Sequence, residues 1–232
     1  MSDRSLALIV GANRGIGLGV VREFLARDWS VVATARRPDA AAELAALRTK
    51  HGDRLEVLPL DMSAPEQIDG FAATMKGRTF DSVLVNAGVA GPSHRSANAA
   101  TPEETGQLMF VNAIGPTRLG RLLLPNLRSG SGVLAFTSSL MGSVALNAGG
   151  HELYRASKAA LNSLSRGLYS EMRGKRLTLL TLHPGWVRTD MGGSGAPVRV
   201  EESARGMVDE MIRASGSGRH AFVDWQGKEI AW

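Results

Sequence analysis

A tyrosine and a lysine spaced four residues apart could carry acid/base chemistry in this sequence. Tyr154 and Lys158 lie in the segment Tyr-Arg-Ala-Ser-Lys, and on a helix they would share one face, with Cβ atoms about 6 Å apart. An ammonium group at that distance stabilises a phenolate and would lower the tyrosine pKa from its ordinary value of ~10. A shift to neutrality requires roughly 4 kcal/mol, which Lys158 and a cationic cofactor ring could supply together. The pair would then act as a general acid/base.

This spacing alone is weak evidence, because chance also produces it. With two tyrosines and five lysines among 232 residues, a lysine follows a tyrosine at this distance with a probability of about 4 %. Many such pairs are solvated helix faces. The interpretation therefore depends on whether the rest of the chain provides a hydride carrier and a carbonyl site.

The composition is that of one globular domain spanning residues 1–232. Hydrophobic residues make up 44% and charged residues 21% of the chain, and its length is sufficient for a full core. The net charge is +5, and 22 of the 27 basic residues are arginines. These are scattered except for Arg36 and Arg37, which argues against a nucleic-acid or polybasic membrane surface. The basicity indicates at most a preference for small anionic ligands.

Several classes of site and location are disfavoured by the residues that are absent or isolated. The chain has no cysteine, so disulfides, thiolate catalysis and cysteine metal sites are excluded. The five histidines lack the spacing of metal ligands, so we expect no metal site. Leu6–Val10 is too short for the apolar part of a signal peptide, and no apolar run reaches membrane-spanning length. We therefore expect a cytoplasmic protein.

The first part of the chain has the order of a dinucleotide-binding unit. An apolar strand at Leu6–Val10 leads into a glycine-rich turn, a helix and a second strand at Ser30–Ala35. Gly11, Gly15 and Gly17 give the spacing G-x-x-x-G-x-G, which lets the backbone approach a pyrophosphate at the helix N-terminus. A glycine turn can also be only a tight connection. The flanking strands favour nucleotide binding.

The end of the second strand indicates which dinucleotide binds. An NAD site usually has an acidic residue there, which holds the ribose 2′-hydroxyl. This chain has Thr34-Ala35-Arg36-Arg37 instead, and Arg36, with Arg14, could bind a 2′-phosphate. The alternative is a pair of solvated arginines at a helix start. We predict NADP(H), with NAD(H) less favoured.

The alternation of strands and helices continues along the chain. It predicts an α/β fold of the Rossmann type, a doubly wound and mostly parallel sheet of about seven strands with helices on both faces. Asp61 and Met62 follow the third strand and could meet an adenine edge, and Ser63 with Glu66 would form a capping box. The further strands are expected at Leu55–Leu60, Asp81–Val85, Ser131–Thr137, Leu177–Leu182 and Arg219–Asp224.

The second half of the chain adds groups suited to chemistry at the same sheet edge. A long helix is predicted from about Thr101 to Leu127, and Pro116 within it leaves the Asn112 carbonyl free to hold a water. Asn112 could equally be an ordinary polar helix residue. Ser139 follows the fifth strand and could donate to a substrate carbonyl, although serines also cap turns. The glycine-rich segment 191–197 suggests a mobile lid.

These motifs together resemble the short-chain dehydrogenase/reductase family over nearly the whole chain. Within that family the sequence is similar to C-factor and sniffer-type carbonyl reductases, through its Arg14–Leu18, Tyr154–Asn162, His183–Gly192 and Asp224–Trp232 segments. The matching motifs, in order, are Gly11–Gly17, Asp61, Asn86-Ala87-Gly88, Asn112, Ser139, Tyr154, Lys158 and Pro184-Gly185.

The resemblance implies a role for each matched residue. Tyr154 would exchange a proton with the substrate oxygen, and Lys158 would lower its pKa and hold the nicotinamide ribose. Ser139, rather than Ser138, would polarise the carbonyl, and Asn112 would hold a water that links Lys158 to solvent. The hydride itself comes from the cofactor. The predicted cofactor contacts are Gly11, Asn13, Arg14, Gly15, Ile16, Gly17, Arg36, Asp61, Met62, Asn86, Ala87, Gly88, Tyr154, Lys158, Pro184, Gly185, Val187 and Thr189.

The substrate itself is less well defined. Met141, Leu146, Trp186 and Met191 are expected to border an apolar substrate pocket. The resemblance also implies a homodimer or homotetramer.

Two departures from the family pattern concern the glycine turn at Gly11–Gly17 and the entrance to the substrate site. Val10 replaces the usual threonine or serine before the first glycine, which removes one hydrogen bond from the glycine turn. The interval between Ser139 and Tyr154 is slightly long, which fits a bulge at Asn147–Gly150.

We therefore expect an NADP(H)-dependent enzyme that interconverts a small carbonyl and an alcohol. The alternative is a C-factor-like protein that senses NADP(H) or signals, with incidental chemistry. A hydrolase is disfavoured, because no Gly-x-Ser-x-Gly elbow joins a strand to a helix.

Overall fold

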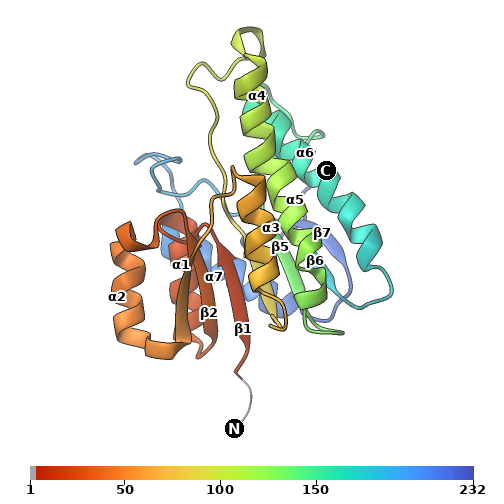
Figure 1. Ribbon diagram of the computed structural model, residues 1–232. Coiled ribbons are helices and arrows are strands. Elements are labelled where there is room, and N and C mark those ends of the chain that lie inside the picture. The colour runs from red at the N-terminus through yellow and green to blue at the C-terminus, as the bar shows by residue number, and fades with distance from the viewer. Residues whose placement is uncertain (1–3) are drawn as a thin grey trace.

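Among residues 4–232, seven parallel strands form one sheet in the order β3-β2-β1-β4-β5-β6-β7 (Figure 1). The computed structural model describes residues 4–232. This order reverses between β1 and β4, which is the switch point where ligands of such sheets bind. The predicted fold class is therefore confirmed. The strands are β1 (Leu6–Val10), β2 (Ser30–Ala35), β3 (Leu55–Pro59), β4 (Ser82–Val85), β5 (Val133–Thr137), β6 (Thr178–His183) and β7 (His220–Asp224).

Helices cover both faces of this sheet (Figure 1). The helices α1, α2 and α7 lie on one face, whereas α3, α5 and α6 lie on the other, with α4 extending beyond the sheet. The helices are α1 (Gly15–Ala26), α2 (Ala42–His51), α3 (Pro65–Thr74), α4 (Pro102–Met109), α5 (Gly115–Leu122), α6 (Glu152–Met172) and α7 (Val200–Ala214).

The central strand β1 shows why its sequence is continuously apolar. Ala7 and Ile9 join the core beneath α1 and α7, whereas Leu8 and Val10 join the core on the opposite face. A parallel strand buried on both faces needs apolar residues at every position, because successive side chains point to opposite sides. Because all the strands are parallel, their carboxyl ends share one edge of the sheet, and the predicted site residues follow these ends.

Two predicted helix features differ from the structure. Ser63 does not cap α3, because its N–H and hydroxyl both donate to the Asp61 carboxylate, and the helix begins at Pro65 with Ala64 as its N-cap. The long helix predicted from Thr101 ends at Leu122 and contains a π-helical turn at Phe110–Ile114. Such turns occur where the helical hydrogen-bond pattern is interrupted, and Pro116 lacks the N–H that would continue it.

Candidate active site

Tyr154 and Lys158 lie together near the N-terminus of α6. The lysine side chain is buried, and its Nζ is 5.8 Å from the centroid of the Tyr154 ring. Nζ donates a 2.9 Å hydrogen bond to the carbonyl oxygen of Thr137, the last residue of β5. The predicted pair is thus formed, and the lysine is fixed to the edge of the sheet.

Burial dominates the acid/base properties of this pair. It raises the pKa of Tyr154 to about 12, and the hydrogen bond from Ser139 only partly offsets this effect. Burial also lowers the pKa of Lys158 to about 8. We expected Lys158 and a cationic cofactor ring together to lower the tyrosine pKa. Burial acts in the opposite direction, because loss of hydration disfavours both charged forms, and the joint effect of the lysine and the cofactor stays a prediction. Tyr154 therefore holds its proton at neutral pH, as a proton donor must.

The two serines after β5 have different partners. The Ser139 hydroxyl is hydrogen-bonded to Tyr154 and accepts the Met141 N–H at 3.1 Å. Ser138 is buried and donates instead to Asn162 Oδ1 at 2.7 Å. Neighbouring residues of an extended segment point to opposite sides, so only Ser139 faces the tyrosine.

Asn112 is fully buried in the π-helical turn and connects two parts of the site. Its Oδ1 accepts the Val89 N–H at 2.8 Å, and its Nδ2 donates to the Val89 carbonyl and to Ser157 Oγ. Gly88 lies between Asn112 and Lys158, since a Cβ there would be 3.2 Å from Asn112 Oδ1 and 3.4 Å from Lys158 Nζ. The Asn112 side chain thus holds the loop after β4 against α6. A water on its main-chain carbonyl stays a prediction.

The glycine turn after β1 has the geometry of an anion cradle. A Cβ at Gly11 would lie 2.8 Å from the Ala87 backbone, and one at Gly17 would lie 2.2 Å from the Gly11 carbonyl oxygen, so both must be glycine. No side chain caps α1, and its first turn contains no acidic residue. The uncapped N–H groups and the helix dipole suit a pyrophosphate, so these residues fit a bound dinucleotide. Asn13 is exposed beside this turn, and Ile16 is half-buried.

Two side chains outside the glycine motif complete the cradle. The Thr34 hydroxyl on β2 accepts the Gly11 N–H at 3.1 Å, which provides a hydroxyl contact to the turn that Val10 cannot make. Asn86 donates to the Gly11 carbonyl and accepts from the Thr137 hydroxyl, each at 3.0 Å. Because the Thr137 carbonyl also accepts a hydrogen bond from Lys158, Asn86 connects the cradle to that lysine.

The residues predicted to bind the adenosine end lie at the ends of β2 and β3. Arg36 is exposed at the end of β2, and its charge contributes to lowering the pKa of Asp61. Burial opposes that shift, whereas the N–H and hydroxyl of Ser63 stabilise the Asp61 carboxylate more than Arg36 does. Met62 is a core residue, 4% exposed, so only its backbone could reach an adenine.

The segment after β6, where we expected a mobile lid at 191–197, is held by hydrogen bonds, and its movement over a substrate stays a prediction. Arg188 N–H donates to the Val198 carbonyl and Val198 N–H donates to the Trp186 carbonyl, which closes the loop at its base. Trp186 Nε1 also donates to the Gly192 carbonyl at 2.8 Å, and the Arg188 guanidinium donates to Ala196. Side-chain hydrogen bonds to backbone carbonyls thus replace the contacts that a glycine-rich segment cannot make itself.

Four predicted cofactor contacts lie at the start of that loop. Gly185 has a φ of 87° and packs against Trp225, and Val187 is buried, so its side chain faces the core. The Pro184 carbonyl accepts the Ser203 hydroxyl of α7 at 2.6 Å. Thr189 is half-buried and lies next to Gly15, where a Cβ would be 3.2 Å from its methyl group. This loop therefore contacts the glycine turn directly.

The four residues predicted for the substrate pocket lie in the segments that follow β5 and β6. Met141 lines a hollow of ≈ 340 Å³ between the loop after β5 and α6. Leu146, Trp186 and Met191 are exposed, at 51%, 59% and 54% of their surface. The hollow is bordered by the 147–150 loop, where Gly149 and Gly150 have positive φ. Neither Ser139 nor Tyr154 lines this hollow, and the contact of the four residues with a substrate stays a prediction.

Three residues of the site were not singled out by the sequence. Each of them forms a hydrogen bond to a residue that the sequence did single out. Thr34 binds Gly11, Thr137 binds Lys158, and Asp190 binds Arg14. The position of Thr34 and Thr137 near strand ends is a weak signal of such contacts. Nothing in the sequence pairs Asp190 with Arg14, because 176 residues separate them.

Comparison with known proteins assigns this site to a family. The model of the short chain dehydrogenase family matches residues 5–197. The chain belongs to the short-chain dehydrogenase family. The predicted family membership is therefore confirmed.

Solved structures and one curated relative support the finer resemblance. A carbonyl reductase from Pseudomonas aeruginosa PAO1 in complex with NADP is 43% identical, with a TM-score of 0.92 over 99% of this chain and 100% of that one. Carbonyl reductase Sniffer of D. melanogaster is 29% identical, with a TM-score of 0.87 over 99% of each chain. The C-signal of Myxococcus xanthus is 38% identical over 166 residues, 70% of this chain and 98% of that protein. The predicted similarity to C-factor and sniffer-type reductases is confirmed.

The described residues, 4–232, contain neither a cluster of metal-binding side chains nor a helix able to cross a membrane. No group of three or more histidine, aspartate or glutamate side chains there is arranged to hold a metal ion. None of the helices in that range combines the length and apolarity needed to cross a bilayer. The candidate active site is therefore the edge of the sheet beside Tyr154 and Ser139.

Proposed function

We propose that this protein is an NADP(H)-dependent oxidoreductase that interconverts an aldehyde or ketone with its alcohol. The observation that carries the proposal is the arrangement of Tyr154, Ser139 and Lys158 beside the glycine cradle. A protonated phenol, a second hydroxyl and a buried ammonium lie at the edge where the cradle would place a dinucleotide. This set fits carbonyl reduction better than binding alone.

The chain's own groups would act on the carbonyl oxygen. The bound nicotinamide supplies the hydride. The hydroxyl groups of Tyr154 and Ser139 would both donate hydrogen bonds to the carbonyl oxygen, which concentrates negative charge on that atom. Tyr154 then transfers its proton there, and the neighbouring Lys158 ammonium stabilises the phenolate left behind. In the oxidation direction, the same tyrosine would take the proton from the alcohol.

The preference for NADP(H) is supported by the charges at the ends of β2 and α1. Arg36 and Arg14 are exposed, and no carboxylate follows β2 at the position that would bind a ribose 2′-hydroxyl. The similar Pseudomonas carbonyl reductase has been solved with NADP. Arg36 and Arg14 would hold the 2′-phosphate through charge-assisted hydrogen bonds.

The proposal is tested by following the oxidation of NADPH and NADH separately with a panel of aldehydes, ketones and quinones. We expect turnover with NADPH for members of the panel and a much lower kcat/KM with NADH. Equal efficiency with the two cofactors would contradict the role assigned to Arg36. Tight NADPH binding without turnover of any carbonyl would contradict the enzymatic proposal.

A second candidate is an NADP(H)-binding protein that acts in signalling. It is favoured by the similarity to the C-signal of Myxococcus xanthus over nearly that protein's whole length. The intact set of Asn112, Ser139, Tyr154 and Lys158 argues against it, because a sensor needs no acid/base group. Binding of NADPH without turnover, in the panel above, is the result that would favour it.

We also propose a cytoplasmic homodimer or homotetramer, formed through the helices that carry Asn112 and Tyr154. Exposed apolar residues occur on these helices: Ile114 and Leu122 are 47% and 42% exposed, and Leu164 is 41% exposed. Sedimentation of the purified protein tests this expectation. A monomer at micromolar concentration would contradict it.

A further inference from the structure

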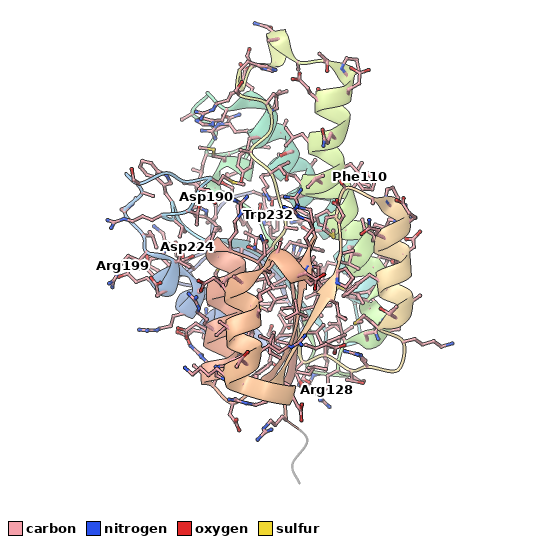
Figure 2. The ribbon with its side chains drawn as sticks, turned by 60° about the vertical axis from the view of Figure 1, so that its left-hand side comes forward. Phe110, Arg128, Asp190, Arg199, Asp224 and Trp232 are labelled. Carbon is pink, nitrogen blue, oxygen red and sulfur yellow. The ribbon has the colours of Figure 1, made fainter. Side chains whose placement is uncertain are left out.

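Arg14, one of the two arginines assigned to the 2′-phosphate of the cofactor, forms an ion pair with the carboxylate of Asp190. Arg14 Nη1 donates to Asp190 Oδ2 at 2.5 Å, although 176 residues separate the two in the chain. Arg14 precedes the first residue of α1, and Asp190 lies on the loop between β6 and α7, where it is labelled in Figure 2. In Figure 1 this loop, in light blue, reaches over the upper end of α1.

The loop is well suited to hold Asp190 at this position. Thr189 packs on Gly15, and its hydroxyl accepts the Gly192 N–H at 3.1 Å while the Gly193 N–H donates to the Thr189 carbonyl. The carboxylate is thus carried by a hydrogen-bonded turn rather than by a free chain. Both members of the ion pair are largely exposed, with side chains 68% and 75% accessible, so a ligand from solvent can reach them.

The second phosphate-binding candidate has no such partner. Among residues 4–232, Arg36 forms no ion pair, and its charge contributes to the lowered pKa of Asp61. The two arginines therefore differ before any cofactor binds. Arg36 is available to a phosphate, whereas Arg14 must first give up or share a carboxylate.

We propose that Asp190 is a specificity-determining residue that weakens the preference of this chain for NADP(H) over NAD(H). This inference rests on the proposed function. As the counter-ion of Arg14, Asp190 competes with the 2′-phosphate for the guanidinium, and its negative charge repels the phosphate when both are near. NAD(H) has no 2′-phosphate, so Asp190 does not compete with it for Arg14. The carboxylate therefore reduces the difference between the affinities for NADP(H) and NAD(H).

The size of the effect follows from the exposure of the pair. Ion pairs between largely exposed side chains interact weakly, because water and salt screen both charges. We therefore expect removal of the Asp190 charge to tighten NADPH binding about fivefold, which corresponds to ~1 kcal/mol. The pyrophosphate is common to both cofactors, so NADH binding should change less than twofold.

Calorimetric titration of the protein with NADPH and with NADH, without substrate, tests this inference independently of turnover. The variants are Asp190→Asn, Arg14→Ala and the double variant, which together form a double-mutant cycle. Asp209→Asn is the matched control, because Asp209 also forms an exposed ion pair, with Arg27 at 2.7 Å, between α7 and α1. We expect D190N to tighten NADPH binding selectively, R14A to weaken it, and the D190N effect to disappear in the R14A background.

Three results would overturn the inference. These are D190N leaving NADPH affinity unchanged or lower, D190N tightening both cofactors equally, and a D190N effect that persists without Arg14. Failure of the wild-type protein to bind NADPH would instead refute the proposed function and the inference with it. Normal wild-type binding with an inert D190N refutes the inference alone.

Discussion

The two halves of the sheet bury very different side chains. Among the described residues, the buried polar or charged ones before residue 100 are only Thr34 and Ser82, whereas fourteen follow that point, including Asn112, Lys158 and Glu210. The first half places its polar groups on the backbone of a glycine turn and on exposed arginines. The second half fixes buried hydroxyl, amide and ammonium groups to one another.

This difference separates the binding of the cofactor from the chemistry. Backbone N–H groups need only the correct chain path, which glycines and an apolar core secure. Acid/base groups need a shifted pKa, which requires burial and fixed partners. Substitutions in the cradle should therefore act through sterics and affinity, whereas those beyond β4 should act through protonation and turnover.

The largest effect on stability is expected from a side chain added to the cradle. In Gly17→Ala, the new Cβ would lie 2.2 Å from the Gly11 carbonyl oxygen and 2.8 Å from Asn86 Nδ2, so the backbone must move. We expect a loss of about 3 kcal/mol or more in the free energy of unfolding, measured by urea denaturation.

Gly70→Ala is the matched control for that substitution. Gly70 also lies in a helix, α3, and a Cβ there would meet nothing within 4 Å. Alanine has a higher helix propensity, so G70A should raise stability by up to ~1 kcal/mol. Equal losses for the two variants would show that the close approach at Gly17 is unimportant.

Acid should destabilise the second half through two half-buried histidines, His183 and His220. Burial lowers the pKa of His183 and of His220 to about 4, with Asp224 opposing the shift at His183 and Arg166 adding to it at His220. Such a histidine stays neutral in the folded protein but is protonated below pH ~6.5 in the unfolded chain. The free energy of unfolding therefore decreases as the pH falls from 6.5 to 4. The loss should approach 3 kcal/mol for each histidine, as an upper bound.

Unfolding free energies measured at about pH 7 and pH 4.5 on wild type and His220→Gln test that expectation. The variant should lose less stability between the two pH values. His51→Gln is the control in the first half of the sheet, where His51 lies near the surface at the end of α2. The account fails if H51Q changes the acid dependence as much as H220Q does.

A smaller effect is expected at the exposed arginine of the cradle. Arg36→Ala should weaken NADPH binding about tenfold, or ~1.4 kcal/mol, and leave NADH binding and stability nearly unchanged. Arg37→Ala, the exposed neighbour, serves as the control. Titration with both cofactors measures the effect. An equal loss of affinity for NADPH and NADH would show that Arg36 contacts a part of the cofactor that both have in common.

The sequence predicted local patterns better than the contacts between distant segments. All seven strands, the glycine turn and the choice of Ser139 over Ser138 follow from apolar runs, spacing and family motifs, and the sheet order agrees with the predicted fold class. The Ser63 cap was wrong because α3 begins at Pro65, with Ala64 as its N-cap. The mobile lid at 191–197 stays a prediction, although the side chains of Trp186 and Arg188 donate to its backbone carbonyls.

The pKa of Tyr154 could not be obtained from spacing for a physical reason. A lysine four residues away on a helix predicts a lower value, but how far each group is removed from water depends on the whole fold. Burial acts on Tyr154 and Lys158 together and raises the tyrosine pKa. The same limit applies to Arg14, whose partner Asp190 is set by tertiary structure alone.

The central claim is that Tyr154 supplies the proton, and single-turnover reduction of a carbonyl by the NADPH-bound protein tests it most directly. Tyr154→Phe should lower the rate at least about 10³-fold without changing the Kd for NADPH, because only the proton donor is lost. Tyr169→Phe removes the other tyrosine hydroxyl, which donates to the Gly218 carbonyl, and should leave the rate unchanged. A wild-type rate in Y154F, or equal losses in the two variants, would contradict the account.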